Sequence, residues 1–140
     1  MKTNLIIKAL VVLMTLSAPA QTREEVVAAV VIHEAGGEGI RGMEAVMEVV
    51  QNRSKERNLT AFQVVTERKQ FSCLNRISLN GLVQKARSHS HWHEAIKLAR
   101  TGSRTDWTRG ANHYHATSVK PGWPKSSQTA KIGRHIFYRF

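Results

Sequence analysis

Apolar and polar residues alternate with helical periodicity over several segments before about residue 101. The first segment carries valines three and four positions apart, at Val27, Val30 and Val31. This spacing predicts a helix with one apolar face. Thr22, followed three positions later by Glu25, is typical of a capping box, so we expect the helix to begin there. The glycine-rich residues 36–39 predict its end and a turn.

The same periodicity predicts further helices later in the chain. Their expected ranges are about 42–52, 60–66, 79–88 and 91–101. Helical spacing then fades while Gly, Pro, Ser and Thr become common, and residues 111–116 and 131–140 are typical of strands. We therefore expect an α+β fold that is mainly helical, with a small antiparallel sheet near the C-terminus.

The first twenty residues are typical of a secretory signal peptide. Lys2 and Lys8 provide positive charge, residues 9–16 are apolar, and Ala18-Pro19-Ala20 fits a small-residue cleavage site. The apolar stretch is short for a membrane span, although an uncleaved anchor is the alternative. We predict a signal peptide at 1–20 and one domain at 21–140, exported to the periplasm, the cell wall or the medium. No stable membrane insertion is expected after cleavage.

The chain is strongly basic, with 21 Lys and Arg against 10 Asp and Glu and a formal net charge of +11. The basic residues are spread along the chain, which favours a polyanionic partner. For an exported protein we expect a cell wall rather than nucleic acid. Cys73 is the single cysteine, so no internal disulfide can form. It is either a nucleophile or, as we favour, a small buried apolar residue.

Glu34 is the most informative candidate for chemistry. It lies four positions after Val30 and three after Val31, on the apolar face and at the helix end. Burial and the negative end of a helix dipole both disfavour an ionised carboxylate. A protonated glutamic acid there could act as a general acid on a glycosidic bond, or it could simply pair with an arginine. Glu38, beyond the glycine turn, is either a second catalytic carboxylate or a solvated loop residue.

Seven histidines raise the alternative of a metal site. His89, His91 and His93 are expected on a solvated helix face, because no set of zinc ligands accompanies them. His113 and His115 would share one face of a strand, and His135 lies in the other predicted strand. These three histidines could form a zinc site with Glu34 as base, or they could line a groove.

Six short segments then form a pattern, in order along the chain: Ile32–Gly39, Gly42–Arg53, Gln70–Cys73, Gly110–His115, Val119–Trp123 and Ile132–Tyr138. Together they resemble the SleB/CwlJ family of bacterial cell-wall hydrolases, from about residue 23 to residue 138. Two positions depart from the family pattern. His33 stands where the family usually has Gly, and Gly36 stands where it often has Arg.

The resemblance implies a lysozyme-like fold and peptidoglycan as substrate, cut between N-acetylmuramic acid and N-acetylglucosamine. It implies a lytic transglycosylase with Glu34 as the catalytic acid and base, needing neither metal nor organic cofactor, and we expect a monomer. The candidate substrate-binding residues are Glu38, Gln70, Ser72, His113, Tyr114 and Trp123. Phe71 and Trp123 fit the core as well as the cleft. Asn52 and Arg53 could close a helix or brace the Glu34 turn.

Two other function classes remain open at this stage. One is a zinc-dependent wall amidase or peptidase that uses the C-terminal histidines. The other is a non-catalytic, cationic wall-binding module. The position of Glu34 at the end of an apolar helix favours glycan cleavage over both.

Overall fold

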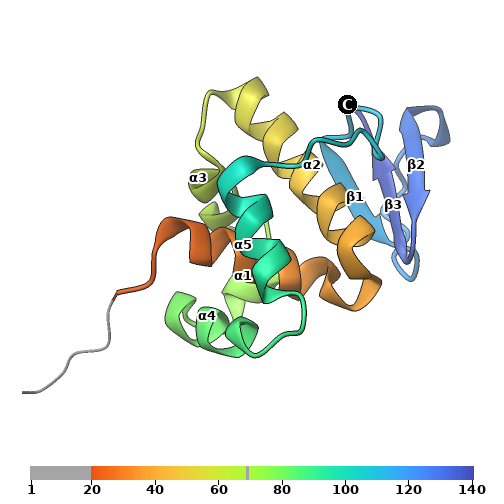
Figure 1. Ribbon diagram of the computed structural model, residues 1–140. Helices are drawn as coiled ribbons and strands as arrows, with labels where there is room; N and C mark the ends of the chain where they lie inside the picture. Colours follow the sequence, from red (N-terminus) through yellow and green to blue (C-terminus); the bar gives the residue numbers. More distant parts are fainter. Residues whose placement is uncertain (1–19, 69) are drawn as a thin grey trace, which may run out of the picture.

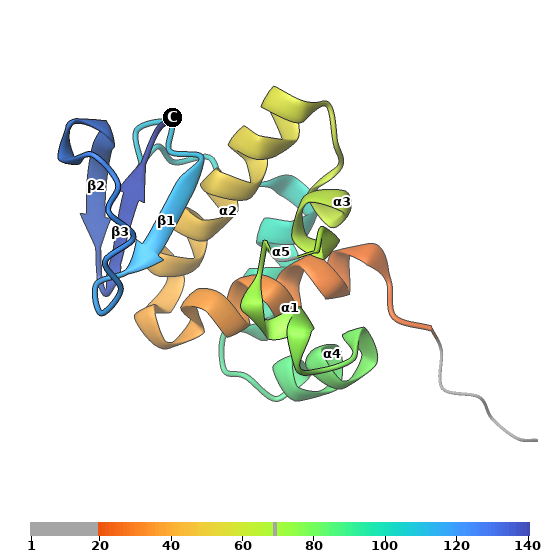
Figure 2. The ribbon, with the colours of Figure 1, turned by 180° about the vertical axis from the view of Figure 1, so that it is seen from behind.

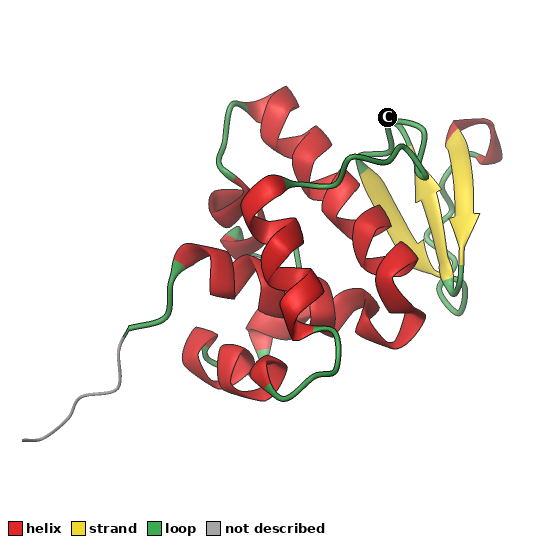
Figure 3. Cartoon of the chain, in the orientation of Figure 1, coloured by secondary structure: helices red, strands yellow, loops and turns green. Residues whose placement is uncertain are grey.

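The computed structural model describes residues 20–68 and 70–140, so the predicted signal peptide lies outside the described residues except for Ala20. In this part of the chain, helices precede a small sheet (Figure 1, Figure 3). The α-helices are α1 (Arg23–Ala35), α2 (Gly39–Arg57), α3 (Ala61–Thr66), α4 (Leu79–Arg87) and α5 (Trp92–Thr101). The strands are β1 (His113–Ala116), β2 (Gln128–Ile132) and β3 (His135–Tyr138). Short 3-10 turns lie at Gly36–Glu38, Ser72–Asn75 and Lys125–Ser127.

Helix α1 is the centre of the helical half. Its capping box forms as predicted, since Thr22 Oγ1 accepts from the Glu25 amide and Glu25 Oε2 accepts from the Thr22 amide. Every residue from Val26 to Ile32 is buried, because α2, α3, α4 and α5 all pack against this helix. A helix that is apolar on nearly all sides is stable only when it is enclosed in this way.

Helix α2 is longer than the predicted 42–52 and separates two apolar cores. The glycine segment forms only one 3-10 turn, and the chain becomes α-helical again at Gly39. Helix α2 then runs to Arg57, and Asn58 caps its C-terminus in the left-handed conformation. One side of α2 packs on the other helices through Met43, Val46, Met47 and Val50. Its opposite side packs on the sheet through Ala45 and Val49 (Figure 1, Figure 2).

Polar side chains of α2 fix the irregular segment that leads into β1. The buried Glu48 carboxylate accepts hydrogen bonds from both the amide and the hydroxyl of Thr108, and from the Trp107 amide and the Thr105 hydroxyl. Asn52 Nδ2 donates to the Ala111 carbonyl at 2.8 Å. These bonds satisfy groups that would otherwise be buried without partners, and they determine where β1 begins.

The sheet is antiparallel with strand order β1-β3-β2. The single strand predicted at 131–140 is wrong, because Gly133 adopts a positive φ of 54° and starts a turn that divides this segment between β2 and β3. Strand β1 is also shorter than predicted, since its start is replaced by the loop held by α2. The cross-strand pairs put Tyr114, His135 and Phe137 on one face and His113, His115 and Tyr138 on the other.

The predicted fold class is confirmed: the protein is mainly helical with a small antiparallel sheet, an α+β arrangement consistent with a lysozyme-like fold. Among residues 20–68 and 70–140, no helix has both the length and the apolar character needed to cross a membrane.

Candidate functional site

Glu34 lies in the last turn of α1, where its carboxylate faces β1. Its side chain is 15% exposed, and Oε2 accepts a hydrogen bond of 2.8 Å from the Tyr114 hydroxyl. The other oxygen, Oε1, is buried and has no hydrogen-bond partner in the part of the chain that the structure describes. The protein therefore holds one oxygen by a hydrogen bond, and the hydrogen-bonding capacity of the second is unused among the described residues.

These two residues belong to an open cleft of about 340 Å³ between the helical half and the sheet. Its other lining residues come from α2, from the segment after α3, from the sheet and from the loop after β1: Arg53, Gln70, Ser72, Asn75, His115, Ala116, Val119 and His135. Mixed polar and apolar groups around one carboxylic acid suit recognition of a polar, uncharged ligand such as a sugar.

Tyr114 is a fixed donor to Glu34. Burial raises the pKa of the Tyr114 phenol well above its ordinary value, and the charge of Glu34 and their hydrogen bond act in the same direction. The hydroxyl therefore stays protonated and can donate throughout the neutral range. Its ring is held by Phe137 and, edge-on, by His135, with ring centroids 5.6 and 5.1 Å away.

Arg53 projects from α2 and joins two walls of the cleft. Its Nε donates to the Asn112 carbonyl at 2.6 Å, and its Nη1 donates to Gln70 Oε1 at 3.1 Å. Burial lowers the pKa of Arg53, but a guanidinium keeps its charge at any physiological pH. Arg53 thus orients Gln70 and braces the start of β1, rather than the Glu34 turn. Phe71 lies under the guanidinium and belongs to the core.

Glu38 lies outside the cleft, contrary to its predicted place among the substrate-binding residues. Its side chain is only 9% exposed, so it is not a solvated loop residue either. The Arg134 amide donates to Oε1 at 3.0 Å, and Oε2 lies 3.0 Å from His135 Nδ1. A Cβ on Gly133 would lie 2.7 Å from this carboxylate, so the turn requires glycine for space as well as for its φ. Glu38 therefore ties the α1–α2 turn to the β2–β3 hairpin.

His113 and Trp123 also lie outside the cleft. Because residues alternate along β1, His113 is on the face opposite to Tyr114, where it packs edge-on against Trp123 and Phe140. Burial, and next the positive charge of Arg53, lower the pKa of His113, so it is neutral at pH 7. These aromatic rings form a cluster on the outer face of the sheet rather than a surface beside Glu34.

The three-histidine zinc site does not form. His135 is on the Tyr114 face of the sheet and contacts Glu38, whereas His113 and His115 are on the other face. Among residues 20–68 and 70–140, one group of potential metal ligands comes close together, and it consists of His33, Glu34 and Cys73. Cys73 is buried, and burial raises the pKa of its thiol to about 11.

The histidines at the start of α5 are part of a local turn. His89 Nδ1 accepts from the His91 amide at 3.2 Å, and His93 is exposed. His89 also fills the space beside Gly36, where an added Cβ would lie 3.0 Å from its Nε2. A larger residue at position 36 would displace this ring, so the two residues are matched to each other.

Comparison with protein families gives one match: the Cell Wall Hydrolase family aligns with residues 37–138, most of the chain. The chain belongs to the cell wall hydrolase family. No curated protein and no solved structure matches it. The aligned region begins three residues after Glu34, so the candidate role of Glu34 depends on the geometry of the cleft and on the adjacent motif.

In this cell wall hydrolase, the cleft brings together four of the residues predicted from sequence: Glu34, Gln70, Ser72 and Tyr114. His115 and His135 were expected to line a groove if they did not bind zinc, and both line the cleft, but sequence reasoning did not assign Arg53, Asn75, Ala116 and Val119 to it. The one available signal was the Asn52-Arg53 pair, since an arginine inside an otherwise buried helix face needs a partner. The other three are ordinary loop and strand residues, whose position depends on how the sheet docks.

Proposed function

We propose that this cell wall hydrolase cuts the glycan strand of peptidoglycan between N-acetylmuramic acid and N-acetylglucosamine, as a lytic transglycosylase with Glu34 as acid and then base. The observation that carries this proposal is the pair of different environments at the Glu34 carboxyl group. Oε2 is fixed by Tyr114, Oε1 is buried without a hydrogen-bond partner among residues 20–68 and 70–140, and the Glu34 side chain lines an open cleft.

In the first step, the protonated Glu34 carboxyl group donates its proton to the glycosidic oxygen. The bond from C1 of the muramic acid to that oxygen breaks, and N-acetylglucosamine leaves with a free 4-hydroxyl group. Positive charge develops at C1, and Glu34 becomes a carboxylate. The Tyr114 hydroxyl stabilises that carboxylate, because a hydrogen bond to an ionised acceptor is stronger than one to a neutral acceptor.

In the second step, the Glu34 carboxylate takes the proton from the 6-hydroxyl group of the same muramic acid. The 6-oxygen bonds to C1, which closes a 1,6-anhydro ring and restores the protonated acid. The nucleophile belongs to the substrate, so one carboxyl group is sufficient. This agrees with the cleft lining, in which Glu34 is the carboxylate and Glu38 is engaged elsewhere.

The remaining features support the same proposal. Gln70 and Ser72 offer hydrogen-bonding groups to the hydroxyl and acetamido groups of a sugar. The net charge of +11 favours an anionic wall, and the predicted signal peptide would deliver the enzyme to it. We propose export to the periplasm or the cell wall, where N-terminal sequencing of the secreted protein would identify the cleavage site.

Digestion of purified peptidoglycan by the wild-type protein and by Glu34→Gln tests the mechanism, with mass spectrometry of the soluble fragments. We expect anhydro-ended fragments from the wild type and at least a hundredfold lower rate for the variant. Glu24→Gln is the matched control, since it alters an exposed carboxylate at the other end of α1.

Two other product patterns would contradict the proposal. Reducing muramic acid ends would show hydrolysis by water and would require a second acidic group. Released peptides with intact glycan strands would show an amidase or peptidase instead. Binding to the wall without any soluble product would show a non-catalytic module.

A further inference from the structure

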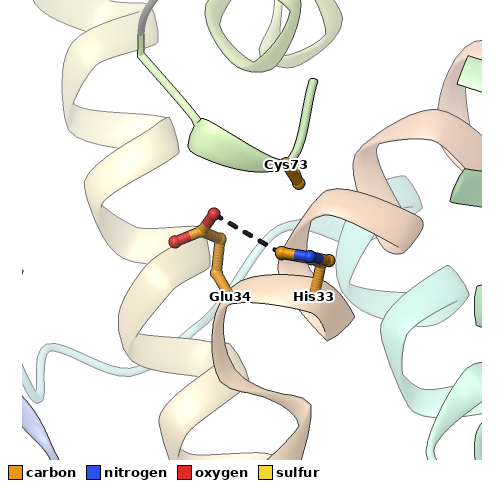
Figure 4. Close-up of side chains that lie close together, drawn as sticks. All are labelled: His33, Glu34 and Cys73. Carbon is orange, nitrogen blue, oxygen red and sulfur yellow. Dashed lines mark ion pairs between the residues drawn. The ribbon is translucent and has the colours of Figure 1, made fainter. Parts of the chain in front are cut away.

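The free oxygen of Glu34 faces two more groups that can bind a metal ion. His33 precedes Glu34 on α1, and Cys73 lies in the short turn Ser72–Asn75 (Figure 4). Figure 4 shows the Cys73 side chain pointing toward the other two. One ligand atom from each residue lies within 4.8 Å of the others. These residues come from two segments that only the tertiary fold brings together.

The chemical types of these three ligand groups favour one class of metal ion. A thiolate, an imidazole and a carboxylate are the ligands of Zn²⁺ and similar thiophilic cations, and Mg²⁺ or Ca²⁺ would need an all-oxygen set. A tetrahedral ion with bonds of about 2.0–2.3 Å separates its ligands by roughly 3.3–3.8 Å. His33 Nδ1 and Glu34 Oε1 are already 3.9 Å apart. The His33 side chain is 36% exposed, so its ring can rotate to close the remaining gap.

The environment of Glu34 gives an independent reason for a ligand here. Within residues 20–68 and 70–140, Oε1 is buried without a hydrogen-bond partner, a state that costs free energy. Tyr114 holds the other oxygen and so fixes the direction of Oε1. A cation would supply the missing partner. It would also replace the proton of Cys73, because coordination to a metal ion deprotonates a thiol even where burial favours the neutral form.

We propose that His33, Glu34 and Cys73 bind a thiophilic divalent cation, of which Zn²⁺ fits best, and that the bound cation inhibits glycan cleavage. The ion would bind the Glu34 carboxyl group, which must carry a proton to act as the acid in the proposed mechanism. The binding half of this proposal concerns the three side chains alone. The inhibitory half rests on the function proposed above.

Co²⁺, used as a spectroscopic substitute for Zn²⁺, tests the binding directly in the purified protein. We expect a thiolate-to-cobalt charge-transfer band that Zn²⁺ abolishes by competition. The band should be absent in Cys73→Ser, and the affinity should fall at least tenfold in His33→Gly. His93→Ala is the control, because this exposed histidine lies outside the group and should leave the band unchanged.

The His33→Gly variant guards against a folding artefact, since it alters a half-exposed side chain, whereas Cys73 is buried in the core. Thermal unfolding should show that Zn²⁺ raises the Tm of the wild type but not that of His33→Gly. Absence of the charge-transfer band in the wild-type protein would overturn the site. So would a band of equal affinity in His33→Gly.

Inhibition is measured separately, as the ratio of the rate of peptidoglycan cleavage with Zn²⁺ to the rate without Zn²⁺, for the wild type and for each variant. The wild type should lose at least nine tenths of its rate and recover it with a chelator, and His33→Gly should need at least tenfold more Zn²⁺. A cobalt band without inhibition would overturn only the inhibitory half. A protein inactive on peptidoglycan at every metal concentration would contradict the proposed function, and the spectral titration would still decide the site.

Discussion

At the residue scale, the hydrogen bond from Tyr114 to Glu34 is the contact on which the proposed chemistry depends most. It joins a helix end to a strand 80 positions later in the chain. The phenol can serve as a donor near neutral pH, because the raised pKa of Tyr114 keeps the proton on its hydroxyl group.

Tyr114→Phe therefore removes the donor that stabilises the Glu34 carboxylate during the reaction. We expect the rate of glycan cleavage to fall by about ten- to a hundredfold, with the fold retained. Thr101→Val is the control for the loss of a hydroxyl group, because Thr101 Oγ1 donates to the Lys97 carbonyl at 2.9 Å on α5, outside the cleft lining. Equal losses in both variants, measured as initial rates of fragment release, would show that the effect is structural rather than specific to the cleft.

At the scale of elements, the N-terminus of α1 is joined to the C-terminus of α4. Glu25 completes the capping box and also accepts from Arg87 Nη2 at 2.6 Å. The hydrogen bond from the Thr22 amide has the largest effect on the pKa of Glu25 and lowers it, and the hydrogen bond from Arg87 lowers it further. The ionised form is therefore favoured in the folded protein, and the pair strengthens folding only while Glu25 is charged.

Glu25→Gln separates the charge from the cap, because glutamine can still accept from the Thr22 amide. At pH 7 we expect the free energy of unfolding to fall by about 0.5–1 kcal/mol. A lowered folded-state pKa gives stability that is present above the unfolded-state pKa of about 4.3 and is lost as the pH falls through the folded value. The difference between variant and wild type should thus shrink below about pH 4 in urea unfolding. A constant difference from pH 7 to pH 3 would contradict the assignment.

A comparison of the expected and observed helices and strands shows which parts of the fold could be predicted from the sequence. The helices were predictable because their periodicity and caps are local, as the Thr22 and Thr60 capping boxes illustrate. The β2–β3 hairpin was missed because apolar residues continue on both sides of Gly133, which alone marks the turn. Glu34, Gln70, Ser72 and Tyr114 were found because they lie within recognisable short motifs.

The remaining site features depend on contacts that no local pattern records. Arg53 reaches Gln70 from another element, and the role of Glu38 is set by backbone and side chain almost a hundred positions later. His113 and Tyr114 were both candidate cleft residues, but alternation along β1 puts the two side chains on opposite faces. Only the docking of the sheet on α2 decides which face meets the cleft.

At the scale of the whole molecule, Glu38 connects the two halves that form the cleft. Glu38 accepts a hydrogen bond from the Arg134 amide and contacts His135, whose ring packs against Tyr114. We therefore expect this second carboxylate to act on the cleft through position rather than through chemistry.

Glu38→Ala should lower the free energy of unfolding by about 2–3 kcal/mol, because it leaves two partners of a largely buried charge unpaired. Glu38→Gln, which keeps one acceptor oxygen, should lose less stability and keep measurable activity. Denaturant unfolding and fragment release are measured on the same samples. Full stability with complete loss of activity in Glu38→Gln would instead assign Glu38 to the chemical step and favour a two-carboxylate mechanism.

The strand order β1-β3-β2 has a consequence for how the enzyme is made. Among the described strands, the central strand β3 is synthesised after both of its neighbours, so β1 has no strand beside it until β3 has been made. Glu34 is synthesised a hundred residues earlier, but Tyr114 acquires its packing partners only when His135 and Phe137 arrive. The packing that holds the Tyr114 hydroxyl against Glu34 can therefore form only after β3 has docked beside β1.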